Sequence, residues 1–162
     1  MTVTIVVAAA LTVGLLVVGG LATQVGAWYR ALRKPSWNPP DWAFGPAWTV
    51  ILGLAAWAGV LAWNGAPDSA GRWRVGVLFG VNMALHFLWS PLFFLLKRPD
   101  WALGEAVLLW LSVLALVVGT APFSALAPWL LAPYLLWVAF AVVLNIAIVR
   151  LNAPFGRRAA TA

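Results

Sequence analysis

The sequence predicts an all-α membrane protein, a five-transmembrane-helix bundle with a Trp- and Pro-rich lid loop between the first two helices. Only 9% of its residues are charged and 64% are hydrophobic, whereas soluble proteins carry roughly 25% charged residues. Long uncharged runs cover residues 1–29, 42–67, 75–96 and 106–149, and one membrane-spanning helix needs about 20 apolar residues. Gly and Pro interrupt the last run near residues 119–128, so it holds two helices. We expect residues 1–162 to form this single domain.

Each helix follows from one of these runs. The first lacks a positively charged start and is longer than the roughly 7 to 15 apolar residues of a signal-peptide core, so we predict a retained helix. The polar turn 64–68 separates the second helix from the third, and the turn 97–100 precedes the fourth, with Asp100 as its expected N-cap. The expected helices cover residues 3–23, 46–63, 73–96, 101–119 and 129–151.

The segment between the first two helices, residues 28–48, is rich in tryptophan, proline and cations. A connection longer than about 15 residues is commonly either disordered or functional, and disordered segments contain few aromatic residues. We therefore expect this segment to fold as a lid over a flat, apolar ligand.

The net charge of +6 indicates membrane insertion rather than nucleic-acid binding, because the cations lie in loops and tails beside apolar helices. Cytoplasmic loops of membrane proteins carry an excess of Lys and Arg. The N-terminus and the second and fourth loops, which lie on one side of the predicted bundle, carry only Arg72 and Arg74. This difference predicts an outside N-terminus and a cytoplasmic C-terminus. The cations of the predicted cytoplasmic side are Arg30, Arg33, Lys34, Lys97, Arg98, Arg150, Arg157 and Arg158.

Two of the predicted helices have distinct faces. At about 100° per residue, the small residues of the third helix lie nearly opposite its polar and aromatic residues. Small residues at this spacing allow close helix approach, either at a homodimer seam or inside the monomer. Asn145 on the fifth helix either contacts a ligand or, as is commoner, hydrogen-bonds a neighbouring helix. The small stripe is Gly76, Gly80 and Ala84, and the opposite face carries Asn82, His86, Trp89 and Phe93.

Several sequence blocks together resemble the tryptophan-rich sensory protein and translocator protein (TspO/MBR) family, once called peripheral benzodiazepine receptors. The resemblance covers essentially the whole chain. One departure is His86, at or near a position where the family commonly has Asn, which changes the expected ligand preference. The matching blocks are WY (28–29), KPSWNPPDWAFGPAWT (34–49), LWSPLFF (88–94), PYLLWVAFA (133–141) and LNIAIVRLN (144–152).

The resemblance implies a homodimeric, multi-pass protein, which we expect in a bacterial cell membrane. Its pocket, closed by the first loop, would bind porphyrins such as protoporphyrin IX or haem and drug-like apolar ligands, with no further cofactor required. Light-dependent porphyrin breakdown has also been ascribed to the family. Residues 142–150 lack the tyrosine of the cholesterol-recognition segment of animal members, which argues against sterol binding.

The candidate ligand-binding residues combine the aromatic lid with the polar and aromatic helix faces. Tryptophans near helix ends, Trp63, Trp73, Trp101 and Trp129, are expected to form interfacial belts instead. Cations of the lid are expected where the propionate groups of a porphyrin emerge. The candidates are Trp28, Tyr29, Trp37, Trp48, His86, Trp89, Phe93, Tyr134, Trp137, Ala141 and Asn145, with Arg30, Arg33 and Lys34 as lid cations.

His86, the only histidine, has three open roles: a hydrogen bond to a ligand, ligation of haem iron, or a neutral contact with a neighbouring helix. Glu105 is expected near the start of the fourth helix, where it could meet Arg98. The sequence offers no catalytic residues and no metal site. We therefore expect a tetrapyrrole-binding protein for sensing, transport or removal. The alternatives are an enzyme for light-dependent porphyrin degradation and a scaffold whose Trp-rich loop binds a partner protein.

Overall fold

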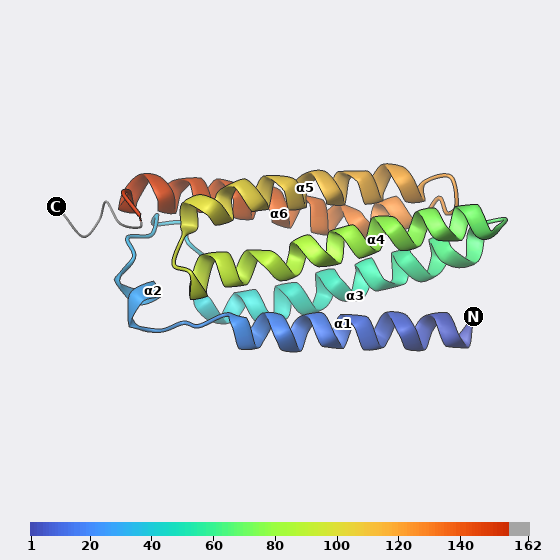
Figure 1. The fold of residues 1–162 in the computed structure, drawn as a ribbon, viewed down its shortest axis with the longest axis horizontal. Helices are drawn as coiled ribbons and strands as arrows, with labels where there is room; N and C mark the ends of the chain where they lie inside the picture. The colour runs from blue at the N-terminus through green and yellow to red at the C-terminus, as the bar shows by residue number, and fades with distance from the viewer. Residues whose placement is uncertain (156–162) are drawn as a thin grey trace.

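The computed structural model describes residues 1–155 and confirms an all-helical fold in that range (Figure 1). Five of its helices are long and apolar enough to cross a membrane. The fourth helix in chain order, α4, continues into the π-helical turn η1, and the short helix α2 lies in the loop after α1. The elements are α1 (Thr2–Ala22), α2 (Ala27–Ala31), α3 (Asp41–Gly65), α4 (Ser69–Ser90), η1 (Pro91–Leu95), α5 (Pro99–Thr120) and α6 (Ala127–Asn152).

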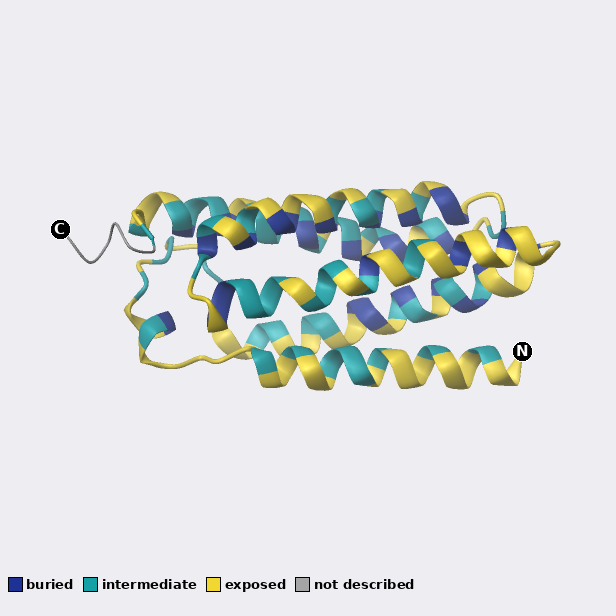
Figure 2. Cartoon of the chain, viewed as in Figure 1, coloured by how far each residue is buried: buried dark blue, intermediate teal, exposed yellow. Residues whose placement is uncertain are grey.

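The long helices run side by side along one axis, and the lid lies at the end opposite Met1 (Figure 1). α5 packs most extensively against α6 and α4, and α3 packs against α6. Their shared core centres on side chains such as Leu116, Leu131 and Val138. By contrast, none of residues 2–22 is buried, and α1 rests mainly on α3 (Figure 2). The bundle is therefore a packed group of four helices with a loosely attached fifth.

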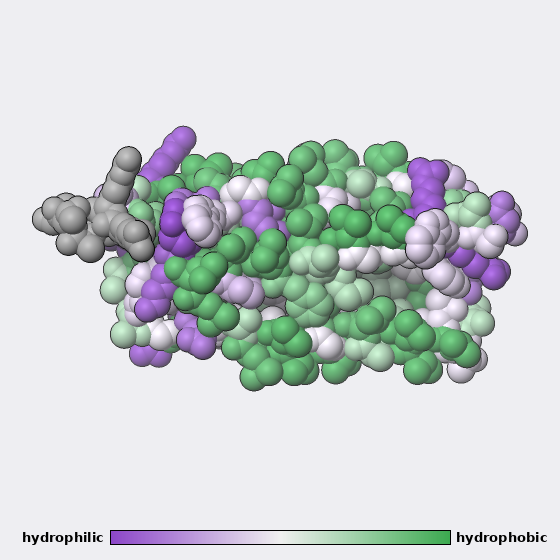
Figure 3. Space-filling view, in the orientation of Figure 1, coloured by the Kyte–Doolittle hydropathy of each residue, from purple (hydrophilic) through white to green (hydrophobic). Residues whose placement is uncertain are grey.

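The face of the bundle seen in Figure 3 is mainly apolar along its length and polar toward both ends. Exposed Val and Leu side chains cover it, among them Val81, Leu108 and Leu136. Such a surface in water would drive association, whereas lipid tails match it. The polar ends therefore mark the two faces of the membrane.

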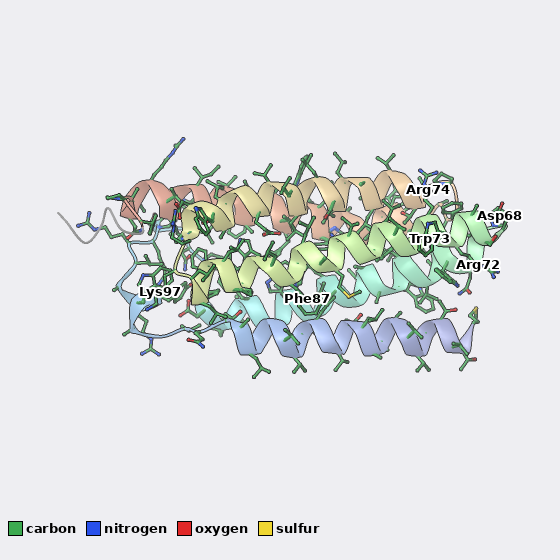
Figure 4. The ribbon with its side chains drawn as sticks, in the orientation of Figure 1. Asp68, Arg72, Trp73, Arg74, Phe87 and Lys97 are labelled. Atoms are coloured by element: carbon green, nitrogen blue, oxygen red, sulfur yellow. The ribbon has the colours of Figure 1, made fainter. Side chains whose placement is uncertain are left out.

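The charged residues divide between these two ends as expected. Asp68, Arg72 and Arg74 lie at the end that holds Met1, and Lys97 lies at the lid end (Figure 4). Arg157 and Arg158, which contribute to the predicted cytoplasmic charge, lie outside the described residues. Trp63, Trp73, Trp101 and Trp129 are all exposed near helix ends, as a belt at the membrane interface requires.

The turn between α3 and α4 is closed by local hydrogen bonding and close backbone packing. The Asp68 carboxylate accepts a hydrogen bond from the Gly71 N–H (2.7 Å) and so caps α4. A Cβ atom added to Gly65 would collide with the Phe123 carbonyl oxygen. Only glycine therefore lets the end of α3 approach the turn between α5 and α6 this closely.

The starts of α3, α4 and α5 differ from the expectation for identifiable reasons. α3 begins at Asp41 rather than residue 46, because Pro40 takes the N-cap position and Pro46 lies inside the helix, as transmembrane helices tolerate. α4 begins at Ser69 rather than residue 73, since Asp68 caps it. The expected N-cap Asp100 lies instead in the first turn of α5, which starts at Pro99, a residue whose fixed φ suits that position.

The lid loop folds onto the end of the bundle. Helix α2 buries Tyr29 against Phe93 and Phe94, with ring centroids 6.4 and 5.4 Å away. Farther along the lid, the Asn152 side chain accepts from the Arg33 N–H and donates to the Arg33 carbonyl, both at 2.8 Å. Asn152 thus ties the loop to the end of α6. The sequence identified the segment as a lid but did not predict α2.

Candidate functional site

A cavity of about 460 Å³ lies inside the bundle beneath the lid. Ligand pockets commonly have volumes of about 300 to 1,000 Å³. Residues of α3, α4, η1 and α6 form most of its wall. One side is closed by Leu15 and Gly19 of the loosely packed α1 and by its C-cap Thr23. Tyr29, Asn38 and Asp41 line its lid end.

Aromatic rings form the widest faces of the cavity. Trp48 of α3 and Trp137 of α6 meet with their ring centroids 6.3 Å apart and their planes nearly perpendicular, at 84°. Phe44, one turn before Trp48 on α3, also packs edge-on against Trp137, with centroids 6.0 Å apart. From α4 and η1, Trp89 and Phe93 stack at 5.0 Å with an interplanar angle of 24°. The cavity therefore presents flat apolar walls from three directions.

A hydrogen-bonded chain of polar side chains runs from the bundle core to the cavity wall. Ser112 donates to the Leu109 carbonyl at 2.7 Å and accepts from Asn82 Nδ2 at 2.8 Å. Tyr134 OH donates to Asn82 Oδ1 at 3.3 Å and lies 3.2 Å from His86 Nδ1. His86 itself lines the cavity, and its ring meets Trp48 edge-on with centroids 4.8 Å apart. The buried chain holds the imidazole in place.

The lid end of the cavity is acidic rather than basic. Asp41 lines it, whereas no Lys or Arg among residues 1–155 does. Tyr29 OH donates to Asp41 Oδ1 at 3.2 Å. Burial, followed by the charge and the hydrogen bond of Asp41, raises the pKa of Tyr29 to about 12. Lys34 Nζ lies 3.9 Å from the centre of the Tyr29 ring.

The lid cations thus lie at the predicted end of the molecule but not in the cavity wall. Arg30, Arg33 and Lys34 belong to α2 and the loop after it. The Arg33 backbone is held by Asn152, and Lys34 contacts the Tyr29 ring. Any attraction between these cations and a ligand would act around the mouth, through solvent, instead of by direct contact in the cavity.

The structure brings most of the predicted ligand-binding residues to this cavity, and three remain outside it. Trp28 packs against Phe93 with centroids 5.9 Å apart and lines a separate pocket near Lys97. Trp37 packs on Phe140, and Tyr134 lies behind His86. The predicted residues in the wall are Tyr29, Trp48, His86, Trp89, Phe93, Trp137, Ala141 and Asn145.

Asn145 serves mainly to join two helices, the commoner of its two expected roles. With its amide oriented to suit its neighbours, its nitrogen donates to the Pro99 carbonyl at 3.3 Å and its oxygen accepts from the Leu103 N–H at 3.0 Å. Both groups belong to the first turns of α5. Asn145 therefore reaches the cavity with its hydrogen-bonding groups already used.

The expected contact between Glu105 and Arg98 is wrong. Arg98 pairs with Asp100 instead, with Nε donating to Oδ1 at 2.8 Å, and its guanidinium lies 4.2 Å from the centre of the Trp101 ring. This pair raises the pKa of Arg98. Glu105 is buried on α5, and neither carboxyl oxygen has a hydrogen-bond partner within the described chain. Arg98 is engaged by Asp100 at the start of α5, whereas the Glu105 carboxyl is buried farther along the helix.

The small-residue stripe of α4 lies on the outside of the bundle. Gly76, Gly80 and Ala84 are all exposed, while Asn82 on the opposite face is buried. A Cβ atom added to Gly76 would touch the Trp63 ring at 3.5 Å, and one added to Gly80 would meet nothing within 4 Å. Close packing within the monomer therefore does not explain Gly80.

Sequence reasoning missed Asp41, Phe44 and the α1 wall. The sequence pattern places Asp41 in the loop because Pro46 suits the start of a helix, whereas α3 begins at Asp41. On α1, Leu15 and Gly19 lie four residues apart, with Thr23 four farther on, so they share one helix face. A polar residue at the end of a Gly-containing face was the signal that could have identified this wall.

Comparison with known proteins agrees with this architecture. Residues 5–151 match the model of the TspO/MBR family. "Tryptophan-rich protein TspO" of Chlorobaculum tepidum is 39% identical over 152 residues, which cover 88% of this chain and 94% of that protein. The protein of the same name from Archaeoglobus fulgidus is 41% identical over 133 residues, covering 82% of this chain and 84% of the relative. The human "Translocator protein" is 35% identical over 126 residues, covering 77% and 75%.

Proposed function

Because the chain belongs to the TspO/MBR family of membrane proteins, we propose that its cavity binds porphyrins and similar flat, apolar ligands, for their sensing, transport or removal. The observation that carries this proposal is the convergence of Trp48, Trp89 and Trp137 on one cavity from three helices. Aromatic side chains bind flat ring systems by stacking and edge contacts. A few polar groups, chiefly His86 and Asp41, would then orient the ligand.

The position of the charges supports a defined ligand orientation. The apolar edge of a porphyrin would enter the deep part of the cavity, beside Leu109 and Val138. Its carboxylate edge would point to the lid end, where Arg30, Arg33 and Lys34 supply positive charge around the mouth. Asp41 opposes that attraction locally, so we expect charge to contribute less to affinity than the rings do.

Titration of the purified protein with protoporphyrin IX tests this function. Several of its 12 tryptophans surround the cavity, so intrinsic fluorescence should be quenched saturably. An unrelated membrane protein in the same detergent serves as the control. Quenching equal to that of the control and without saturation would contradict tetrapyrrole binding. Running the titration in light and in darkness separates binding from degradation, because only an enzyme would consume the bound porphyrin under illumination.

We also propose an orientation and an assembly for the protein in the membrane. The lid end, which carries Arg30, Arg33, Lys34, Lys97 and Arg98, faces the cytoplasm, and the end with Met1 faces outward. Two copies pair through the exposed stripe Gly76, Gly80 and Ala84, where the absence of large side chains allows close approach of two α4 helices.

A further inference from the structure

We infer that His86 is a metal-coordinating residue: its Nε2 atom supplies an axial ligand to the metal of a metalloporphyrin bound in the cavity. The site would then favour tetrapyrroles that carry a metal with an open axial position over metal-free ones. This inference rests on the proposed function and specifies the chemical class of its ligand.

The direction of the buried hydrogen-bonded chain assigns the tautomer of His86. Ser112 uses its proton on the Leu109 carbonyl, so it accepts from the Asn82 amide nitrogen. The Asn82 oxygen then accepts the proton of Tyr134 OH. Having used its proton, Tyr134 can only accept from His86 Nδ1. In the neutral imidazole, Nδ1 thus carries the hydrogen and Nε2 carries a free lone pair.

The free nitrogen is accessible from the cavity. Within residues 1–155, Nε2 of His86 makes no hydrogen bond. It also keeps some accessible surface, unlike the fully buried polar atoms that have no partner. His86 lines the cavity, and the Trp48 ring packs edge-on against the imidazole with centroids 4.8 Å apart. The Tyr134 hydroxyl at Nδ1 and the Trp48 ring, which also contacts the Tyr134 ring, together restrict the orientation of the imidazole.

This arrangement suits a metal ligand better than a hydrogen-bonding residue. Histidines that bind metals usually donate their second ring N–H to an oxygen, which fixes the tautomer and raises the basicity of the ligating nitrogen. Here Tyr134 supplies that oxygen. On binding, the Nε2 lone pair forms a bond to the metal and one solvent ligand leaves it, with no transfer of a proton or an electron. A metal-free porphyrin offers no such bond.

The composition of the chain makes the inference easy to test. His86 is the only histidine, and there is no cysteine, so no other imidazole and no thiolate can replace it. We propose to compare the wild-type protein with His86→Ala and His86→Asn. Each variant is titrated with ferric protoporphyrin IX and with metal-free protoporphyrin IX, and the absorbance spectrum of the ferric complex is recorded.

The wild-type protein should bind the ferric porphyrin at least about tenfold more tightly than the metal-free one, a difference of about 1.4 kcal/mol. Both variants should lose this preference and the spectrum of a nitrogen-ligated iron, and their affinity for the ferric porphyrin should fall at least about tenfold more than their affinity for the metal-free one. Added imidazole should restore the spectrum in His86→Ala, where it fills the space left by the side chain.

Tyr134→Phe tests the positioning role of the chain behind His86. It keeps the ring and removes the oxygen that accepts from Nδ1, so the iron spectrum should shift and the ferric affinity should fall by about tenfold. Metal-free porphyrin should bind nearly as before. A loss of both affinities in equal measure would show a merely structural role for Tyr134.

The outcomes separate this inference from the proposed function. If the wild-type protein binds neither porphyrin saturably, both fail. If it binds metal-free porphyrin saturably but the ferric form no more tightly, or if His86→Ala keeps the wild-type iron spectrum, only the inference is overturned. Should the variants fail to fold, resonance Raman spectroscopy of the reduced wild-type complex still decides, because an iron–imidazole stretching band supports coordination and its absence contradicts it.

Discussion

At the residue scale, the hydrogen bond between Tyr29 and Asp41 links the lid to the first turn of α3. Tyr29 is buried against Phe93 and Phe94, while Asp41 is exposed at the mouth of the cavity. One phenol thus joins α2, α3 and η1. This contact and the Asn152 hydrogen bonds to Arg33 both tie the lid to the bundle.

Alkaline pH should loosen this contact. The pKa of Tyr29 rises from the ordinary 10.0 to about 12 in the folded protein, so folding favours the neutral phenol. Its stabilising contribution is complete below about pH 10 and is lost as the pH rises toward about 12. The thermal unfolding midpoint in detergent should therefore fall between these pH values, and it should fall less in Tyr29→Phe. An equal fall in both proteins would contradict the role of Tyr29.

Residue roles within the span helices were easier to predict than those in the lid. Trp48, Trp89 and Trp137 lie a turn or more inside their helices, and helical spacing alone places them on interior faces. Trp28 and Trp37 depend on the path of an irregular loop, which no periodicity encodes. The contact between His86 and Tyr134 depends on how far α4 is shifted along α6, which also leaves no local signal.

At the element scale, the close approach of α3 to the α5–α6 turn depends on Gly65. In Gly65→Ala the new methyl group would collide with the Phe123 carbonyl oxygen, so the backbone must move. We expect a loss of about 1 to 3 kcal/mol in stability, measured by thermal unfolding in detergent.

Gly53→Ala on the same helix is the matched control. A Cβ atom at Gly53 meets nothing within 4 Å, and alanine favours helix over glycine by up to about 1 kcal/mol. That variant should be neutral or slightly stabilised. Equal unfolding temperatures for Gly65→Ala and Gly53→Ala would show that the turn adapts freely.

The number and order of the span helices could be predicted because apolar length alone determines them. Their starts could not be predicted where proline was ambiguous. Pro40 and Pro46 both suit the start of a helix, and packing of Phe44 against Trp137 accompanies the earlier start at Asp41. The helical segment α2 has only five residues, too few for a periodic pattern, and is formed by burial of Tyr29.

At the scale of the whole molecule, the exposed stripe of α4 predicts a homodimer. Gly80→Leu places a bulky side chain in the proposed seam and should shift the detergent-solubilised particle from dimer to monomer, as measured by light scattering with size-exclusion chromatography. Gly14→Leu on the exposed α1 is the control, since Gly14 also has open space around it. If both variants keep the wild-type mass, the seam lies elsewhere.

The distribution of cations predicts the orientation of the whole bundle. A fluorescent protein fused to the C-terminus should be bright in bacterial cells, and alkaline phosphatase fused there should be inactive, because the positively charged end stays in the cytoplasm. Fusions in the turn between α3 and α4 should give the opposite pattern. A dark fluorescent fusion with an active phosphatase at the C-terminus would invert the proposed orientation.

The affinity of cavity variants for protoporphyrin IX tests the central claim most directly. Trp48→Ala and Trp137→Ala each remove a ring from the cavity wall and should weaken binding by at least about tenfold, or 1.4 kcal/mol. The reason is that stacking contributes roughly 0.5 to 1.5 kcal/mol beyond the free energy gained by burying apolar area. Trp129→Ala removes an exposed ring outside the cavity and should leave affinity unchanged. If all three folded variants bind protoporphyrin IX with wild-type affinity, the ligand does not occupy this cavity.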